Sequence, residues 1–281
     1  MELSAILRIE EWARAAMTLN HAAIRDGSES VAALPSGVDV RDLEIYAEHR
    51  RRFRGVLNTS SVASWVAYVQ CLATADPFRA GVPCFIDAEK ARASIALDLL
   101  TLEGRPGHCQ NQAIVNLKPV ALYAALCELD GRALDQRAMV DFLGDWRNAW
   151  IAYSDGLEVL GGMAALAALR QIDIKAHAVT GSETGNMSET RSSFASIEAT
   201  SRTALPASFY FSVKPYAELN ERTVIADLHI IPNDKAPTLK LRIRGLLELR
   251  ESIAVEFGEL VAAKLQAAKL DVLPVIGTFT P

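Results

Sequence analysis

The chain has 281 residues, of which half are hydrophobic and 22% are charged, so it is long enough to bury one large core or two smaller ones. Its 29 lysines and arginines against 34 aspartates and glutamates give a formal net charge of −5, which excludes a global attraction to nucleic acids. Neither a membrane span nor a signal peptide is visible in the apolar runs. We therefore expect a soluble protein of the cytoplasm, in which any polyanion site is a local basic patch.

The first part of the chain shows helical spacing and short apolar runs. Residues 3–25 predict an amphipathic helix, and residues 31–34 predict a short strand. Asn58-Thr59-Ser60-Ser61 offers an N-cap for a helix that starts at Val62, and Asp135 offers a cap for another. The remaining elements expected before residue 170 are strands over 82–86, 93–100 and 113–117 and helices over 119–129, 136–150 and 157–169.

From about Ile172 onward, an alternation of apolar and polar residues replaces helical spacing, which is typical of strands. The Ser/Thr/Gly-rich run 180–193 predicts a long hairpin tip or a mobile loop. Strands are expected over 208–214, 223–231 and 238–249, and short loops between them predict an antiparallel meander. Residues 253–261 either continue this pattern or start a closing helix. The predicted fold class is α+β: a mixed α/β region over 1–170 and a β-rich region over 171–281, as two regions or as one integrated domain.

Several short motifs recur in one known family. They are RFRG (52–55) before a helix of the form VASWVAYVQ, VPCFID (82–87), LD (97–98), GHCQ (107–110), ALDQRAMVDFLGDW (133–146), LPASFYFSVKPY (205–216) and LKLRIRG (239–245). In these motifs the chain resembles the YfdQ-like proteins, a family of unknown function encoded by tailed phages and prophages. The chain departs from the family after Leu117, where a Thr-x-x-Trp helix opening is expected. The resemblance implies a phage or prophage origin and expression in the bacterial cytoplasm, and it carries over no catalytic residue.

The sequence contains no motif that cradles a nucleotide phosphate and no metal-ligand spacing. Neither G-x-x-x-x-G-K-[ST] nor G-x-G-x-x-G is present, and the five histidines show no H-x-x-x-H spacing. The four cysteines form no C-x-x-C pair, and we expect reduced thiols in the core. No cofactor and no metal is therefore predicted. The cysteines are Cys71, Cys84, Cys109 and Cys127.

One alternative is a metal-dependent nuclease. Asp87 ends a predicted strand, Asp98 lies in the next one and His108 precedes the third, so the three could hold Mg²⁺ and a water molecule. Against this, Glu89 and Lys90 are neighbours rather than the two ends of a Glu-x-Lys motif, so alternation sends their side chains to opposite faces. Without a catalytic role, Asp87 caps a turn, Asp98 faces solvent and His108 is a loop residue.

Two basic clusters are the main candidates for a binding site. Guanidinium groups bind phosphates in a bidentate manner, and an aromatic ring among them can stack a base. The same arginines could instead pair with nearby acids such as Asp42, Glu44 and Glu48, or with acids of a neighbouring subunit. The first cluster is Arg50, Arg51, Arg52, Phe53 and Arg54, and the second is Lys240, Arg242 and Arg244 on one face of a predicted strand.

These observations predict a non-enzymatic accessory protein rather than a catalyst. An exposed β-meander can add strands across subunits, so we expect a homo-oligomer. Its partners would be DNA, RNA or a host protein, engaged through the two basic clusters in phage DNA metabolism or host takeover. A metal-dependent nuclease and an inhibitor of a host defence protein are the alternatives.

Overall fold

The computed structural model describes residues 53–75, 81–172, 204–231 and 237–280, together with positions 8, 48 and 49. The chain divides into two compact units, Met1–Arg52 and Phe53–Pro281, and both β-sheets belong to the second. Apart from the helical Arg8, the helix expected over 3–25 lies outside the described residues. The strand expected over 31–34 and the loop expected over 180–193 also lie outside them.

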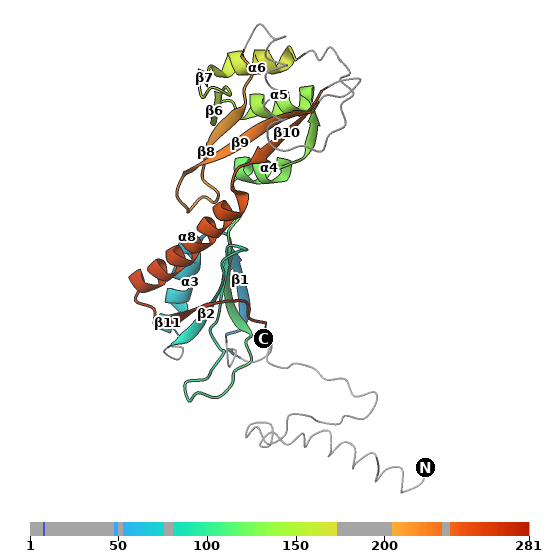
Figure 1. Ribbon diagram of the computed structural model, residues 1–281. Helices are drawn as coiled ribbons and strands as arrows, with labels where there is room; N and C mark the ends of the chain where they lie inside the picture. The colour runs from blue at the N-terminus through green and yellow to red at the C-terminus, as the bar shows by residue number, and fades with distance from the viewer. Residues whose placement is uncertain are drawn as a thin grey trace, which may run out of the picture. The chain divides into compact units, whose positions relative to one another are not determined.

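The predicted α+β class is confirmed by two separate β-sheets and the helices that cover them (Figure 1). The first sheet is mixed and has the order β1-β4-β3-β2-β11; its strands are β1 (Gly55–Thr59), β2 (Val82–Asp87), β3 (Arg92–Ala96), β4 (Asn111–Asn116) and β11 (Val272–Ile276). The second sheet is antiparallel and has the order β5-β10-β9-β8-β6-β7; its strands are β5 (Ala133–Asp135), β6 (Trp150–Tyr153), β7 (Val159–Leu160), β8 (Ser208–Val213), β9 (Arg222–Ile231) and β10 (Thr238–Ile243). Each sheet thus takes strands from both sides of residue 170.

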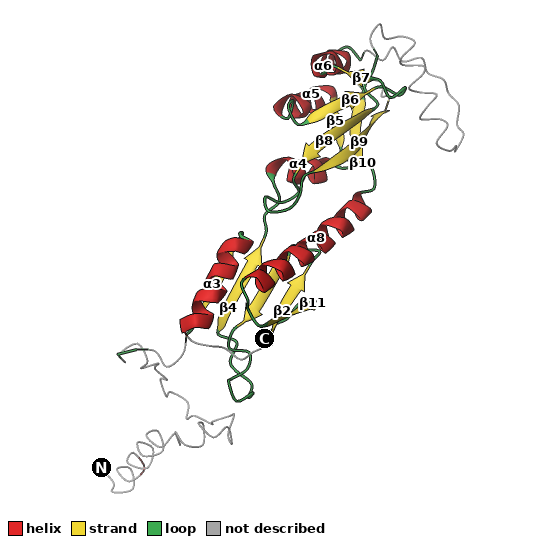
Figure 2. Cartoon of the chain, turned by 90° about the vertical axis from the view of Figure 1, so that its left-hand side faces the viewer, coloured by secondary structure: helices red, strands yellow, loops and turns green. Residues whose placement is uncertain are grey.

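Each sheet packs described helices against one face only. In the first sheet, α3 (Val62–Ala75) and α8 (Leu246–Ala267) share a core with the inward residues of the strands, including Trp65 and Ile95. In the second, three helices pack on one side, as Figure 2 shows: α4 (Ala121–Leu129), α5 (Gln136–Asp145) and α6 (Gly162–Arg170). The result is two layers, helix on sheet, built twice.

Two of the helix starts are fixed by the caps that the sequence predicts. The Oγ of Ser61 accepts a hydrogen bond from the backbone N–H of Ser64 at 3.3 Å, and the Oδ1 of Asp135 accepts one from Ala138 at 2.7 Å. At α3 a distant residue adds a second partner, because the Oε1 of Glu218 accepts the N–H of Val62 at 2.8 Å. These bonds satisfy amides that the helices cannot satisfy internally.

Two expected helices are wrong at one end. The helix expected over 136–150 stops at Asp145, because Trp150 belongs to strand β6. Its ring is buried against that of Phe209 on β8, with centroids 5.1 Å apart, and its Nε1–H donates to the carbonyl of Leu143. The helix expected from residue 157 begins only at Gly162, because Val159 and Leu160 pair with β6 as strand β7.

The strand expected over 238–249 is also too long. It ends at Ile243, after which Gly245 adopts a left-handed conformation (φ 63°) and α8 begins at Leu246. Glycine tolerates this conformation, which turns the chain at the junction. Within α8 the buried residues recur every fourth position, a helical period that the expected strand pattern had masked. They are Ile253, Phe257, Val261 and Leu265.

Helix α8 belongs to both hydrophobic cores. Ile253 near its start packs in the core of the second sheet, whereas Phe257 and Val261 pack in the core of the first. Glu256 fixes the helix between them, because it accepts the N–H of Asn220 at 2.7 Å and pairs with the guanidinium of Arg222 on β9. One helix therefore contributes apolar surface to both sheets.

The predicted meander is confirmed, but neither of its outer strands is free. Strands β8, β9 and β10 pair in succession, while β10 also pairs with β5 and β8 also pairs with β6. The true edges of this sheet are the three-residue β5 and the two-residue β7. Short edge strands leave little backbone for another chain to pair with, which disfavours strand addition at this sheet.

Candidate nucleic-acid interface

The two predicted basic clusters lie at different sheets: the first precedes a strand of the five-stranded sheet, and the second lies on a strand of the six-stranded sheet. Arg50, Arg51 and Arg52 lie outside the described residues. Phe53, which is 53% exposed, and the exposed Arg54 stand immediately before β1 of the first sheet. The second cluster is on β10 of the second sheet. The structure therefore does not bring the described members of the two clusters onto one sheet.

Strand β10 sorts its side chains as the alternation predicts. Leu239, Leu241 and Ile243 are buried under the helices, while Arg242 is exposed and Lys240 is half-buried on the other face. Arg244, one residue beyond the strand, is also exposed. All members of the second cluster therefore lie away from the helices, as expected. We call the face of the six-stranded sheet that carries them the open face.

The neighbouring strand places one carboxylate among these cations. Lys240 stands opposite His229, and Arg242 stands opposite Asp227. Arg244 forms a bidentate pair with Asp227, with its Nη2 2.6 Å from Oδ1 and its Nε 3.2 Å from Oδ2. Hydrogen bonding to Asp227 raises the pKa of Arg244 and holds the side chain in place. Among the described residues, Lys240 and Arg242 form no ion pair, so their charged groups are available to an outside partner.

Two tyrosines on the open face are functional candidates that sequence reasoning missed. The rings of Tyr153 on β6 and Tyr210 on β8 lie against each other, with centroids 4.4 Å apart and planes inclined by 53°. Both residues are half-buried. The signal was present in SFYFSV, where alternation buries Phe209 and Phe211 and turns Tyr210 to the opposite face.

The rest of the open face carries both polar and apolar side chains, and no described helix covers it. Ile151, opposite Tyr210, is 51% exposed. Two further carboxylates lie at its ends, and both are engaged: Asp135 caps α5, and Glu221 accepts a hydrogen bond from the hydroxyl of Ser212 at 2.6 Å. Lys240 and Arg242 therefore lie on the β10 side of the face, whereas the side chain of Arg244 reaches Tyr210 across β9.

The alternative metal residues have local structural roles. Asp87 accepts the N–H of Lys90 at 3.3 Å and forms an ion pair with its Nζ at 3.4 Å. Asp98 accepts the N–H groups of Gln110 and Asn111, both at 2.9 Å, and so orders the loop before β4. His108 is exposed on that loop. Among the described residues, no three histidines, cysteines, aspartates or glutamates are close enough to hold a metal ion, so this set is not brought together.

The cysteines are unpaired but not all lie in the core. Cys84 is buried, and burial raises the pKa of its thiol to about 12. Cys109 and Cys127 are half-buried, whereas Cys71 is exposed on α3, which corrects the expectation for that residue. Cys71 faces solvent because α3 is amphipathic and buries only the face that carries Trp65 and Val69.

The fold and this surface define an α+β protein with a one-sided antiparallel sheet that presents cations and tyrosines. The chain belongs to a family of uncharacterized conserved proteins, DUF2303, whose family model matches residues 2–279. Comparisons with curated proteins and with solved structures found no match. Among the described helices, none combines the length and the apolar character needed to cross a bilayer.

Proposed function

We propose that this protein binds single-stranded nucleic acid on the open face of its six-stranded sheet, without performing a reaction. The observation that carries the proposal is the placement of Lys240, Arg242 and Arg244 on the same face as the contacting rings of Tyr153 and Tyr210. Sheets that bind single strands combine cations for the backbone with aromatic rings for the bases. Here β9 separates Lys240 and Arg242 from the tyrosines, and Arg244 reaches Tyr210 across it.

A single strand fits this surface better than a duplex. Tyrosine rings stack on bases only when those bases are not already stacked within a helix, and the half-exposed rings of Tyr153 and Tyr210 lie in the sheet rather than on a protruding helix. Because the chain carries a net charge of −5, affinity would depend on the local cations and would fall steeply with added salt.

Fluorescence anisotropy with a labelled single-stranded oligonucleotide tests the proposal. We expect saturable binding without a divalent ion. The double variant Lys240→Gln/Arg242→Gln should lower the magnitude of the salt slope by about 1.4, at about 0.7 per lost phosphate contact. Tyr210→Ala should weaken binding by about 1–3 kcal/mol, the usual contribution of one base–aromatic stack.

The control is Arg147→Gln, because Arg147 is exposed in the turn after α5 and not on a strand of the open face. It removes one positive charge from another surface and should leave the salt slope unchanged. Equal weakening in Arg147→Gln and in the β10 variants would mean that binding is non-specific. Mg²⁺-dependent cleavage of the oligonucleotide would contradict a non-enzymatic role.

We further propose that the protein acts in the bacterial cytoplasm as a phage or prophage product in phage DNA metabolism, as its resemblance to the YfdQ-like proteins implies.

We also propose that it self-associates. In support, large apolar side chains are exposed on and next to the β6–β7 hairpin: Ile151, Leu157, Val159 and Met163. Light scattering on the full chain should give a mass above that of one protomer, and Val159→Lys should reduce it. A monomer at all concentrations would contradict self-association.

A further inference from the structure

A pocket lies away from the open face, where the two cores meet at the start of α8. Its volume is about 210 Å³, room for about seven water molecules. Apolar side chains, among them Pro119 and Ile253, form part of the wall, together with the rings of Tyr123 and Tyr216. The two ring centroids are 6.3 Å apart. This pocket is independent of the proposed nucleic-acid site, because it shares no residue with it.

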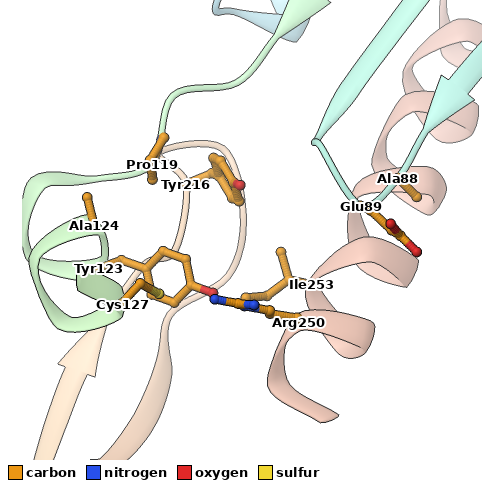
Figure 3. Close-up of a pocket in the computed structure, with 9 residues that line it drawn as sticks. All are labelled: Ala88, Glu89, Pro119, Tyr123, Ala124, Cys127, Tyr216, Arg250 and Ile253. Atoms are coloured by element: carbon orange, nitrogen blue, oxygen red, sulfur yellow. The ribbon is translucent and has the colours of Figure 1, made fainter. Parts of the chain in front are cut away.

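The pocket has hydrogen-bond donors on one side. Figure 3 shows the hydroxyl group of Tyr123 next to the guanidinium of Arg250. Burial raises the pKa of Tyr123 and of Tyr216, so both phenols keep their protons at neutral pH and can donate. A guanidinium beside phenol donors suits an oxyanion such as a carboxylate.

A negative charge also lines the pocket. Glu89, in the turn after β2, is one of the lining residues (Figure 3), and its side chain is exposed. Within the described part of the chain, neither Glu89 nor Arg250 forms an ion pair, with each other or with another residue. Two opposite charges that both line one small pocket and do not neutralise each other favour a ligand that carries both signs.

We infer that this pocket binds a small zwitterion of the α-amino acid class. The carboxylate of the ligand lies at Arg250 and the hydroxyl group of Tyr123, its ammonium lies at Glu89, and a compact apolar side chain contacts Pro119 and Ile253. A few placed polar groups on an apolar wall are the usual composition of small-molecule sites. No covalent step is involved.

Three probes of the same size class test the inference by titration calorimetry on the full chain. They are L-leucine, 4-methylpentanoate, which lacks the ammonium group, and 3-methylbutylamine, which lacks the carboxylate. We expect L-leucine to bind about tenfold more tightly than either analogue, because each lacks one charge-assisted contact. Arg250→Gln should remove the preference over the amine, and Glu89→Gln should remove the preference over the acid.

Arg147→Gln is the control, since Arg147 does not line the pocket. Unchanged thermal melting of the variants, followed by circular dichroism, ensures that a loss of binding reflects the pocket. The inference is overturned if no probe binds saturably up to about 10 mM. It is also overturned if 4-methylpentanoate binds as tightly as L-leucine, or if Arg147→Gln weakens binding as much as Arg250→Gln.

Discussion

In the five-stranded sheet, the face away from the helices is partly covered by the chain's own aromatic residues. Phe85 of β2 is stacked on Phe279 with ring centroids 4.6 Å apart. In the six-stranded sheet, the corresponding face keeps Arg242 exposed and Tyr210 half-buried, and no described segment stacks on it. The helix-facing sides of both sheets are similar and apolar, so the two sheets differ mainly in their outer faces.

This difference shows why the partners of the charged groups, rather than residue type alone, identify the candidate site. Two carboxylates next to the strands of the first sheet are engaged within the fold: Asp98 orders a loop, and Asp87 pairs with Lys90. On the second sheet, Asp227 engages Arg244 but leaves Lys240 and Arg242 without an ion partner among the described residues. Charges that the fold does not itself use are the ones available to a ligand.

The largest expected effect tests whether the two regions unfold together. Trp65→Ala in the first core and Phe209→Ala in the second each remove a fully buried ring, which should cost about 3–5 kcal/mol. Because α8 packs in both cores, we expect one urea transition, shifted by either substitution, when circular dichroism and fluorescence are compared. Two separate transitions, of which only one moves, would show that the regions are independent.

A smaller effect is expected at the loop that Asp98 orders. Asp98→Ala leaves two amide groups without an acceptor and should lower the free energy of unfolding by about 1–3 kcal/mol. Asp98→Asn, which keeps one side-chain oxygen, should lose less. Urea denaturation measures both. If Mg²⁺ stabilised the wild type but not Asp98→Ala, the residue would be a metal ligand rather than a structural acceptor.

The ion pair between Glu256 of α8 and Arg222 of β9 should contribute less to the free energy of unfolding. Glu256→Gln weakens the pair with Arg222, whose side chain is 21% exposed, and should cost about 1–2 kcal/mol once solvent screening is considered. Addition of 1 M salt, at which the screening length is about 3 Å, should reduce the difference between variant and wild type. A cost that stays constant with salt would assign the effect to packing instead.

The smallest prediction is a gain in stability. Gly258 lies inside α8, and a Cβ built there has no heavy atom within 4 Å apart from its own helix and chain neighbours. Gly258→Ala should therefore raise the free energy of unfolding by about 0.5–1 kcal/mol, because alanine loses less backbone entropy in a helix. Thermal melting measures it. A lower melting temperature would indicate that the helix must bend at this residue.

Local patterns predicted much of this fold, whereas pairing over long distances could not be predicted. The caps at Ser61 and Asp135, the meander and the alternation along β10 are all encoded within a few residues. The end of the helix at Asp145 depends on a tertiary contact of Trp150 with Phe209, which local propensity does not contain. In the candidate site, the cations were predicted, but the meeting of Tyr153 and Tyr210 required the pairing of β6 with β8.

The position of β11 has a consequence for how the protein is made. This strand pairs in parallel with β2, so Val272 lies beside Val82, although 190 residues (272 − 82) separate them along the chain. Until the ribosome has released both α8 and β11, β2 has an unpaired edge and the ring of Trp65 lacks part of its apolar cover. The six-stranded sheet needs only residues up to Ile243, so we expect its strands to pair first during translation, and the early strands to wait for the last ones.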